Sequence, residues 1–161
     1  MKKVIIVLVL FLTLISNMSF AALTQNAAVM LQTPQDENAQ FTNASSAGTY
    51  VTVYTGGANG SKVVSLLATN SDAVSHLVTC QIATAGTNYG GTAITVPGTS
   101  GFANSVPPVN IMASANWYGL PLDSDGNPFI FLTSTQFIKC TFATTVTTAT
   151  VLNVNALGAD F

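Results

Sequence analysis

Apolar and polar residues alternate with a period of two along most of the chain, which is the pattern of strands with one buried face. In Thr49–Thr55, Val51 and Val53 fall on one face while Tyr50 and Tyr54 fall on the other. These runs are rich in threonine, valine, isoleucine and aromatic residues, which suit a pleated sheet surface. The pattern predicts strands over residues 49–55, 62–69, 76–83, 92–96, 109–112, 129–132, 136–143 and 148–156.

Turn residues separate the predicted strands. Residues 56–60 are Gly-Gly-Ala-Asn-Gly and residues 70–72 are Asn-Ser-Asp, and glycine and asparagine tolerate the backbone angles of tight turns. Residues 85–91 form a further predicted turn, and Pro97 ends the strand that follows it. Several short strands at this spacing indicate an all-β sandwich or barrel. We predict a single β-sandwich, jelly-roll-like in its architecture, over residues 48–161.

The first 21 residues have the features of a secretory signal peptide. Lys2 and Lys3 precede a run of mostly apolar residues from Val4 to Ile15, and small residues surround the expected cleavage after Ala21. The run is shorter than the about 20 apolar residues that a bilayer core requires. We therefore expect export to the periplasm, the cell surface or the medium, with no stable membrane span after cleavage. An uncleaved anchor and a misassigned start codon are the alternatives.

Residues 22–47 are predicted to form an N-terminal arm. Leu23–Thr33 fits either a short helix or an edge strand, and Pro34 ends it in both cases. Gln35–Ala47 is mostly polar and is predicted to be a loop or part of the arm.

Composition excludes several classes of partner. After residue 21 the chain has two lysines, six acidic residues and no arginine, which gives a net charge of −4. A surface without basic groups has little attraction for a phosphate backbone or an anionic membrane, so we expect no nucleic-acid partner. The chain is 48% hydrophobic and only 6% charged, so extensive disorder is not expected. Its 21 threonines after residue 21 predict a polar but weakly charged surface.

The two cysteines are expected to form a disulfide, because exported proteins mature in oxidising compartments. Cys80 shares its predicted face with Val78 and Ile82, while Cys140 shares its face with apolar neighbours on another strand. Both sulfurs therefore point toward the core, and a buried bridge between two core strands follows. Two buried free thiols are the alternative.

Residues 123–127, Asp-Ser-Asp-Gly-Asn, have the spacing with which calcium loops begin. Asp123, Asp125 and Asn127 would supply the oxygen ligands of a calcium ion. The distant glutamate of an EF-hand is missing, and Pro128 follows directly. A plain turn between two strands is the simpler interpretation.

Trp117 and Tyr118 are the candidate ligand-binding residues. Adjacent aromatic side chains beside a loop can stack on a sugar, which would make the protein a glycan- or ligand-binding module. Packing of these rings at one end of the sandwich is the alternative.

No catalytic cluster stands out in the sequence. His76 is the only histidine, so a Ser-His-Asp arrangement would have to use it, and no Gly-x-Ser-x-Gly motif supplies a nucleophile. An edge or surface position for His76 is the simpler interpretation. Asp123 and Asp125 are expected to face solvent within one turn, which does not suit the raised pKa of a glycosidase acid. We expect no enzymatic activity and no cofactor, with calcium as the one alternative.

Four segments resemble a family of small, uncharacterised proteins of bacteriophages and prophages. They are residues 54–63 (YTGGANGSKV), 68–73 (ATNSDA), 119–129 (GLPLDSDGNPF) and 158–161 (GADF), in the same order as in the family. The resemblance covers most of residues 48–161 and implies a virion-associated β-sandwich that decorates or lines a capsid, without an established activity. The leader and the cysteine pair depart from the family pattern, so a host-encoded relative in the cell envelope is the alternative.

Together these observations favour a non-enzymatic structural subunit or coat component that associates with itself or with another structural protein. A secreted glycan- or ligand-binding module is the second hypothesis.

Overall fold

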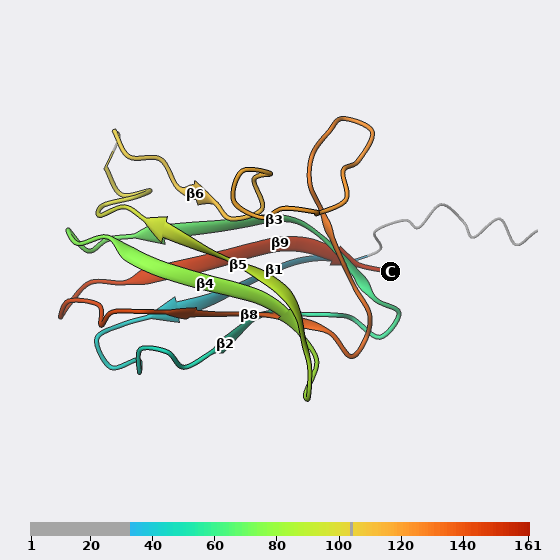
Figure 1. Cartoon of the computed structure of the whole chain (residues 1–161), viewed down its shortest axis with the longest axis horizontal. Coiled ribbons are helices and arrows are strands. Elements are labelled where there is room, and N and C mark those ends of the chain that lie inside the picture. The colour runs from blue at the N-terminus through green and yellow to red at the C-terminus, as the bar shows by residue number, and fades with distance from the viewer. Residues whose placement is uncertain (1–32, 104) are drawn as a thin grey trace, which may run out of the picture. The chain divides into compact units, whose positions relative to one another are not determined.

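A computed structural model describes residues 33–103 and 105–161, and every described element of regular structure is a β-strand (Figure 1). The predicted leader and residues 22–32 of the predicted arm lie outside the described residues. The strands are β1 (Thr33–Phe41), β2 (Val51–Thr55), β3 (Ser61–Asn70), β4 (His76–Ala83), β5 (Asn88–Val96), β6 (Val109–Asn110), β7 (Ile130–Leu132), β8 (Phe137–Phe142) and β9 (Leu152–Asp160).

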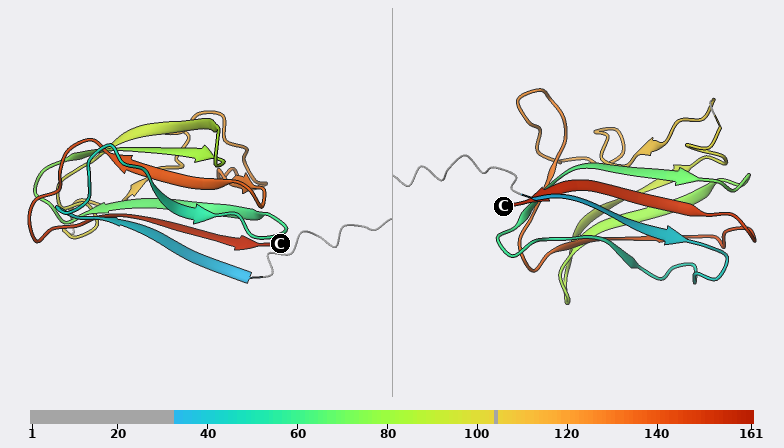
Figure 2. Two further views of the ribbon diagram at one scale, coloured as in Figure 1. Left: turned by 90° about the horizontal axis from the view of Figure 1, so that it is seen from below. Right: turned by 180° about the vertical axis from the view of Figure 1, so that it is seen from behind.

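Two antiparallel sheets pack face to face, which confirms the predicted β-sandwich. One sheet has the order β1-β9-β3-β6, with β7 also paired to β3, and the other has the order β2-β8-β4-β5. The two layers are seen edge-on in the left view of Figure 2. If the short β7 is set aside, each sheet alternates strands from the two ends of the chain, as in a double-sheet jelly roll. The jelly-roll-like architecture is therefore confirmed as well.

Alternation of side chains builds the core between the sheets. In β4, Val78 and Cys80 are fully buried, and in β9 the buried positions include Leu152, Val154 and Ala156. These inward residues come from strands of both sheets and form one apolar cluster. The alternation that predicted the strands is thus the alternation that fills the core.

Most predicted strands are present with shifted ends, and β4 has the predicted bounds. β9 begins four residues later than expected and ends four residues later. β5 begins at Asn88, inside the segment predicted as a turn, and its register shifts between Ile82 and Ala83 of β4. Glycines in this stretch suggested a turn, but the ladder with β4 continues through Gly90 and Gly91.

The interpretation of Gln35–Ala47 as a loop or arm is wrong for its first half. Thr33–Phe41 forms β1, which pairs along its whole length with β9. Its inward positions are polar at Gln35 and Glu37 and apolar only at Ala39 and Phe41, so the first half of the strand lacks the apolar residues that would reveal the alternation. Pairing with the last strand holds β1 in the sheet despite this polar pattern.

Candidate functional site

The disulfide joins Cys80 of β4 and Cys140 of β8, which confirms the predicted buried bridge. Both side chains are fully buried, and the two residues are directly opposite each other in the register of the strands. The bridge therefore links two neighbouring strands of the same sheet. A sequence separation of 60 residues makes it a long-range constraint on the fold.

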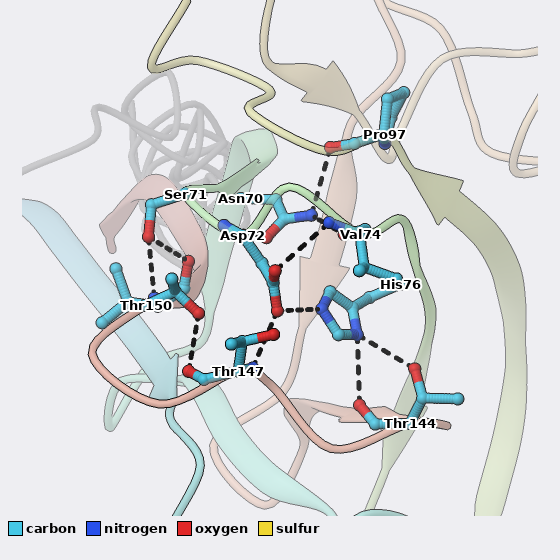
Figure 3. A network of polar contacts seen from close by, with 10 residues as sticks. Asn70, Ser71, Asp72, Val74, His76, Pro97, Thr144, Thr147 and Thr150 are labelled. Carbon is cyan, nitrogen blue, oxygen red and sulfur yellow. Dashed lines mark hydrogen bonds and ion pairs between the residues drawn. The ribbon is translucent and has the colours of Figure 1, made fainter.

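A buried polar network fastens the loops at one end of the sandwich (Figure 3). Asp72 follows β3 and is 2% exposed, and His76 begins β4 and is 1% exposed. Asp72 Oδ2 lies 3.1 Å from His76 Nε2 and accepts the backbone N–H of Thr147 at 2.7 Å. His76 Nδ1 lies 3.1 Å from the carbonyl oxygen of Thr144. The Asp72–His76 pair thus ties the β3–β4 loop to the β8–β9 loop.

Asn70 extends this network to a third loop. Its side-chain amide donates to the carbonyl oxygens of Val74 at 2.8 Å and Pro97 at 3.2 Å, while its oxygen accepts the N–H of Asp72 at 2.9 Å. Because Pro97 follows β5, the connection between β5 and β6 is held as well. A fully hydrogen-bonded network of this kind fixes one arrangement of its loops.

The electrostatics of Asp72 favour its ionised form. The hydrogen bond from Thr147 is the strongest of the effects that hold the pKa of Asp72 well below its ordinary value of 3.8. The interpretation of His76 as an edge or surface residue is wrong, because its ring is buried against Asp72 and Thr144. Because each ring nitrogen lies within hydrogen-bonding distance of a loop residue, we interpret the pair as structural.

A second polar cluster lies at the opposite end of β3 and β9. The Ser61 hydroxyl donates to Asp160 Oδ1 at 2.6 Å and accepts the N–H of Gly57 at 2.8 Å. A Cβ atom on Gly57 would lie 2.5 Å from Asp160 Cγ, so this close approach requires glycine. Glu37 accepts the N–H of Thr55 at 3.3 Å, and desolvation is the main cause that raises its pKa above 4.5.

The Asp123–Asn127 segment forms a hydrogen-bonded turn. Asp123 Oδ1 accepts the N–H groups of Asp125 at 3.0 Å and Asn127 at 2.8 Å, and Gly126 has the positive φ of +82° that the turn requires. The hydrogen bond from the backbone N–H of Asn127 is the largest effect that lowers the pKa of Asp123. Within residues 33–103 and 105–161, no three His, Cys, Asp or Glu side chains gather closely enough to hold a metal ion. Calcium binding at Asp123, Asp125 and Asn127 stays a prediction.

The two candidate aromatic residues have different environments. Trp117 is only 5% exposed and belongs to the apolar core, whereas Tyr118 is 85% exposed. A sugar stacking on this segment would therefore meet the Tyr118 ring, while the Trp117 ring packs in the apolar core.

Both sheets present weakly charged outer faces. On the sheet of β2, β8, β4 and β5, Thr52, Thr79 and Thr95 alternate with buried apolar residues. Lys139 lies among them with its Nζ 5.1 Å from the centroid of the Tyr50 ring. On the other sheet, the exposed large apolar residues include Val64, Phe131 and Leu157.

Comparisons of the chain with family models, with curated proteins and with solved structures found no match. Among the residues that the structure describes, no helix is long and apolar enough to cross a membrane.

Sequence reasoning missed the Asp72–His76 pair and the aromatic surface around Phe131. Asp72 and His76 are four residues apart in the sequence. This spacing predicts no contact, because Asp72 lies in a predicted turn and His76 in a predicted strand, and a repeat pattern holds only within one element. The alternation of Phe129 and Phe131 was also visible, but it does not show which face of the strand is buried.

Proposed function

We propose that this protein is a non-enzymatic structural subunit, a coat or decoration-type component that works by self-association or by contact with another structural protein. The observation that carries the proposal is the edge of β5, which is the last strand of its sheet and, among residues 33–103 and 105–161, pairs with β4 alone. The proposal places the protein outside the cytoplasm.

The sequence of β5 makes this edge suitable for strand addition. Asn88–Val96 contains no charged residue and no proline, which are the usual devices that protect an exposed edge from pairing. Residues 88–91 are exposed at the start of the strand, and Tyr89 is 58% exposed. An extended segment of a neighbouring subunit would gain main-chain hydrogen bonds here and shallow contacts with small side chains.

The strand order gives the proposal support by analogy. Double-sheet jelly rolls occur in viral capsid proteins and in lectins, and a fold by itself does not define a function. The analogy agrees with the resemblance to phage proteins, for which the virion would be the site of action. The disulfide is compatible with an oxidising compartment, which favours the periplasm, the cell surface or the medium.

Size-exclusion chromatography with light scattering tests the proposal on the full chain, expressed with its leader and purified after export. We expect an oligomer whose mass rises with concentration. Ala93→Lys places a charge on the exposed edge of β5 and should weaken the association, while Ser124→Lys in the exposed Asp123 turn should not. A strictly monomeric wild-type protein at high concentration would contradict the proposal.

The second candidate is a secreted glycan- or ligand-binding module, which the exposure of Tyr118 favours. A glycan array with and without calcium tests it. Binding that disappears in Tyr118→Ala would support this function. If binding also depends on calcium and Asp123→Asn removes that dependence, the Asp123 turn would be the calcium site. An array without signal under both conditions would contradict it.

A further inference from the structure

Two carboxylates lie on the inner face of the sandwich, at the end beside the C-terminus. Glu37 of β1 shares its face with the buried Ala39. Asp160 of β9 shares its face with the buried Ala156. Both acidic side chains are partly exposed, so solvent and small ions reach their oxygens. Together with two buried hydroxyl groups they form what we call the Tyr54 cluster, which consists of Glu37, Tyr54, Ser61 and Asp160.

Hydrogen bonds from neutral groups hold both carboxylates in place. The Ser61 hydroxyl donates to Asp160 Oδ1 at 2.6 Å, and Gln35 Nε2 lies 3.4 Å from Asp160 Oδ2. On β1, Glu37 Oε2 accepts the backbone N–H of Thr55 at 3.3 Å, which links it to the opposite sheet. The carboxylates are thus oriented by donors that do not cancel their negative charge.

No basic side chain in the described part of the chain neutralises these two charges. The one ion pair there lies at the opposite end of the sandwich. The described lysines, Lys62 and Lys139, lie over aromatic rings that do not belong to the cluster. After desolvation, the charge of Asp160 is one of the causes that raise the pKa of Glu37. The two like charges therefore act on each other, and a cation between them would relieve this repulsion.

The hydroxyl group of Tyr54 points into the same region. Tyr54 is fully buried, and its Oη makes no hydrogen bond to any described residue. It lies against the backbone of Gly158, where a Cβ atom would be only 2.8 Å from Oη. Gly158 precedes Asp160 by two residues on the same face of β9. Its partner in β1 is Gln35, which precedes Glu37 by two residues.

The surroundings of this hydroxyl are both apolar and acidic. Desolvation is the main cause that raises the pKa of Tyr54, and the charges of Asp160 and Glu37 act in the same direction. Buried polar groups normally have a partner. An ion held between the two carboxylates would give the Tyr54 oxygen one.

We propose that the Tyr54 cluster binds a calcium ion through the carboxylates of Glu37 and Asp160 and the hydroxyl oxygen of Tyr54. Calcium accepts about six to eight oxygen ligands in adaptable geometry, whereas magnesium requires a nearly regular octahedron. Ligands from β1, β9 and β2, which belong to two sheets, suit the more adaptable ion, and water completes its shell. With two carboxylates, we expect a dissociation constant of about 0.1–1 mM, as in extracellular calcium modules. The inference does not rest on the proposed self-association.

Isothermal titration calorimetry with calcium chloride tests the inference. The sample is the full chain, expressed with its leader, purified after export and freed of metal with EDTA. Glu37→Gln and Asp160→Asn should each weaken binding by about tenfold or more, because each removes a charge from the ligand set. Tyr54→Phe deletes only the hydroxyl group and should weaken binding by about threefold or more.

Two further variants are the matched controls. Asp36→Asn removes a charge from the residue next to Glu37, on the exposed outer face of β1. Asp123→Asn removes a carboxylate from the other candidate calcium segment. Both should leave the dissociation constant within about twofold of the wild type.

Thermal unfolding gives a second readout, which a purely structural role of Glu37 would not produce. In EDTA, Glu37→Gln should unfold at a higher temperature than the wild type, because desolvation disfavours the carboxylate. In about 10 mM calcium, the wild-type midpoint should rise by about 5 °C or more, and the order of the two proteins should reverse. The midpoints in EDTA also show that each variant is folded.

A wild-type chain that binds no calcium up to about 10 mM would overturn the inference. Binding that Asp123→Asn abolishes and that the three cluster variants leave unchanged would overturn it as well, because the ion would then lie in the Asp123 turn. Neither result bears on self-association, which light scattering measures separately.

Discussion

Cys80 and Cys140 lie directly opposite each other on neighbouring antiparallel strands, with their Cα atoms 4.1 Å apart. A separation this short is typical of pairs without mutual backbone hydrogen bonds, where side chains come closest. The disulfide therefore fixes the register of β4 against β8, the central pair of its sheet. Each of the flanking strands, β2 and β5, pairs with one member of this pair.

Removing this disulfide should strongly destabilise the protein. A bridge across a loop of 60 residues is expected to contribute about 4 kcal/mol by restricting the unfolded chain. Urea unfolding with and without reductant should show a large fall of the midpoint on reduction. The double variant Cys80→Ala with Cys140→Ala should show the low midpoint under both conditions. The expectation would be contradicted if the reductant frees both thiols of the wild type and the urea midpoint stays unchanged.

Asp72 should make stability fall at acid pH. Its pKa in the folded protein is below the ordinary value of 3.8, so the folded state favours the carboxylate. The stabilisation is complete above about pH 4 and is lost as the pH falls toward the folded pKa. Asp72→Asn should lower the free energy of unfolding at pH 7 by about 2 kcal/mol, because the Thr147 amide loses its charged acceptor.

Urea unfolding of both proteins between pH 7 and pH 2 measures this effect. The stability curve of Asp72→Asn should be flatter than that of the wild type below about pH 4. Asp125→Asn removes one exposed charge from a turn and serves as the control. Parallel curves for the wild type and Asp72→Asn would show that Asp72 is not the group responsible.

Glu37 should have the opposite effect on stability. Desolvation, aided by the charge of Asp160, raises its pKa above 4.5, so its ionisation costs stability at neutral pH. Glu37→Gln keeps an oxygen that accepts the Thr55 N–H and should stabilise the protein at pH 7. The gain is expected to stay below about 1 kcal/mol, because the side chain is partly solvated. It should vanish below about pH 4 in thermal or urea unfolding, and a variant less stable than the wild type at pH 7 would refute this.

Substitutions of Trp117 and of Tyr118 should have very different effects on the free energy of unfolding. Trp117→Ala removes a ring from the core and is expected to cost about 3–5 kcal/mol. Tyr118→Ala changes an exposed side chain and should alter stability by less than about 0.5 kcal/mol. Equal effects of the two substitutions in urea unfolding would contradict their placement. If Trp117→Ala loses ligand binding and Tyr118→Ala keeps it, the loss would reflect unfolding of the variant and not a missing ligand contact.

The sequence allowed the sandwich and the disulfide to be predicted because both depend on alternation. Val78, Cys80 and Ile82 repeat every second residue, and this pattern identified both the strand and the inward direction of the sulfur. β1 could not be predicted in the same way, because Gln35 and Glu37 occupy its inward positions. Its place in the sheet depends on pairing with β9, more than 100 residues away in the chain.

The candidate surfaces were less predictable for a related reason. Alternation of apolar and polar residues divides a strand into two faces, but it does not tell which face a neighbouring sheet covers. Phe131 and Leu157 are as apolar as the core residues beside them, yet both lie on the outer face. His76 was misjudged because its burial depends on Asp72 and Thr144, which come from two separate loops.

The proposed structural role requires that this chain associates through its surfaces. Sedimentation velocity of the oxidised protein across a wide range of concentration measures this association. We expect the sedimentation coefficient to rise from that of the single chain to that of a larger species as the concentration increases. A single-chain coefficient at every concentration would contradict it.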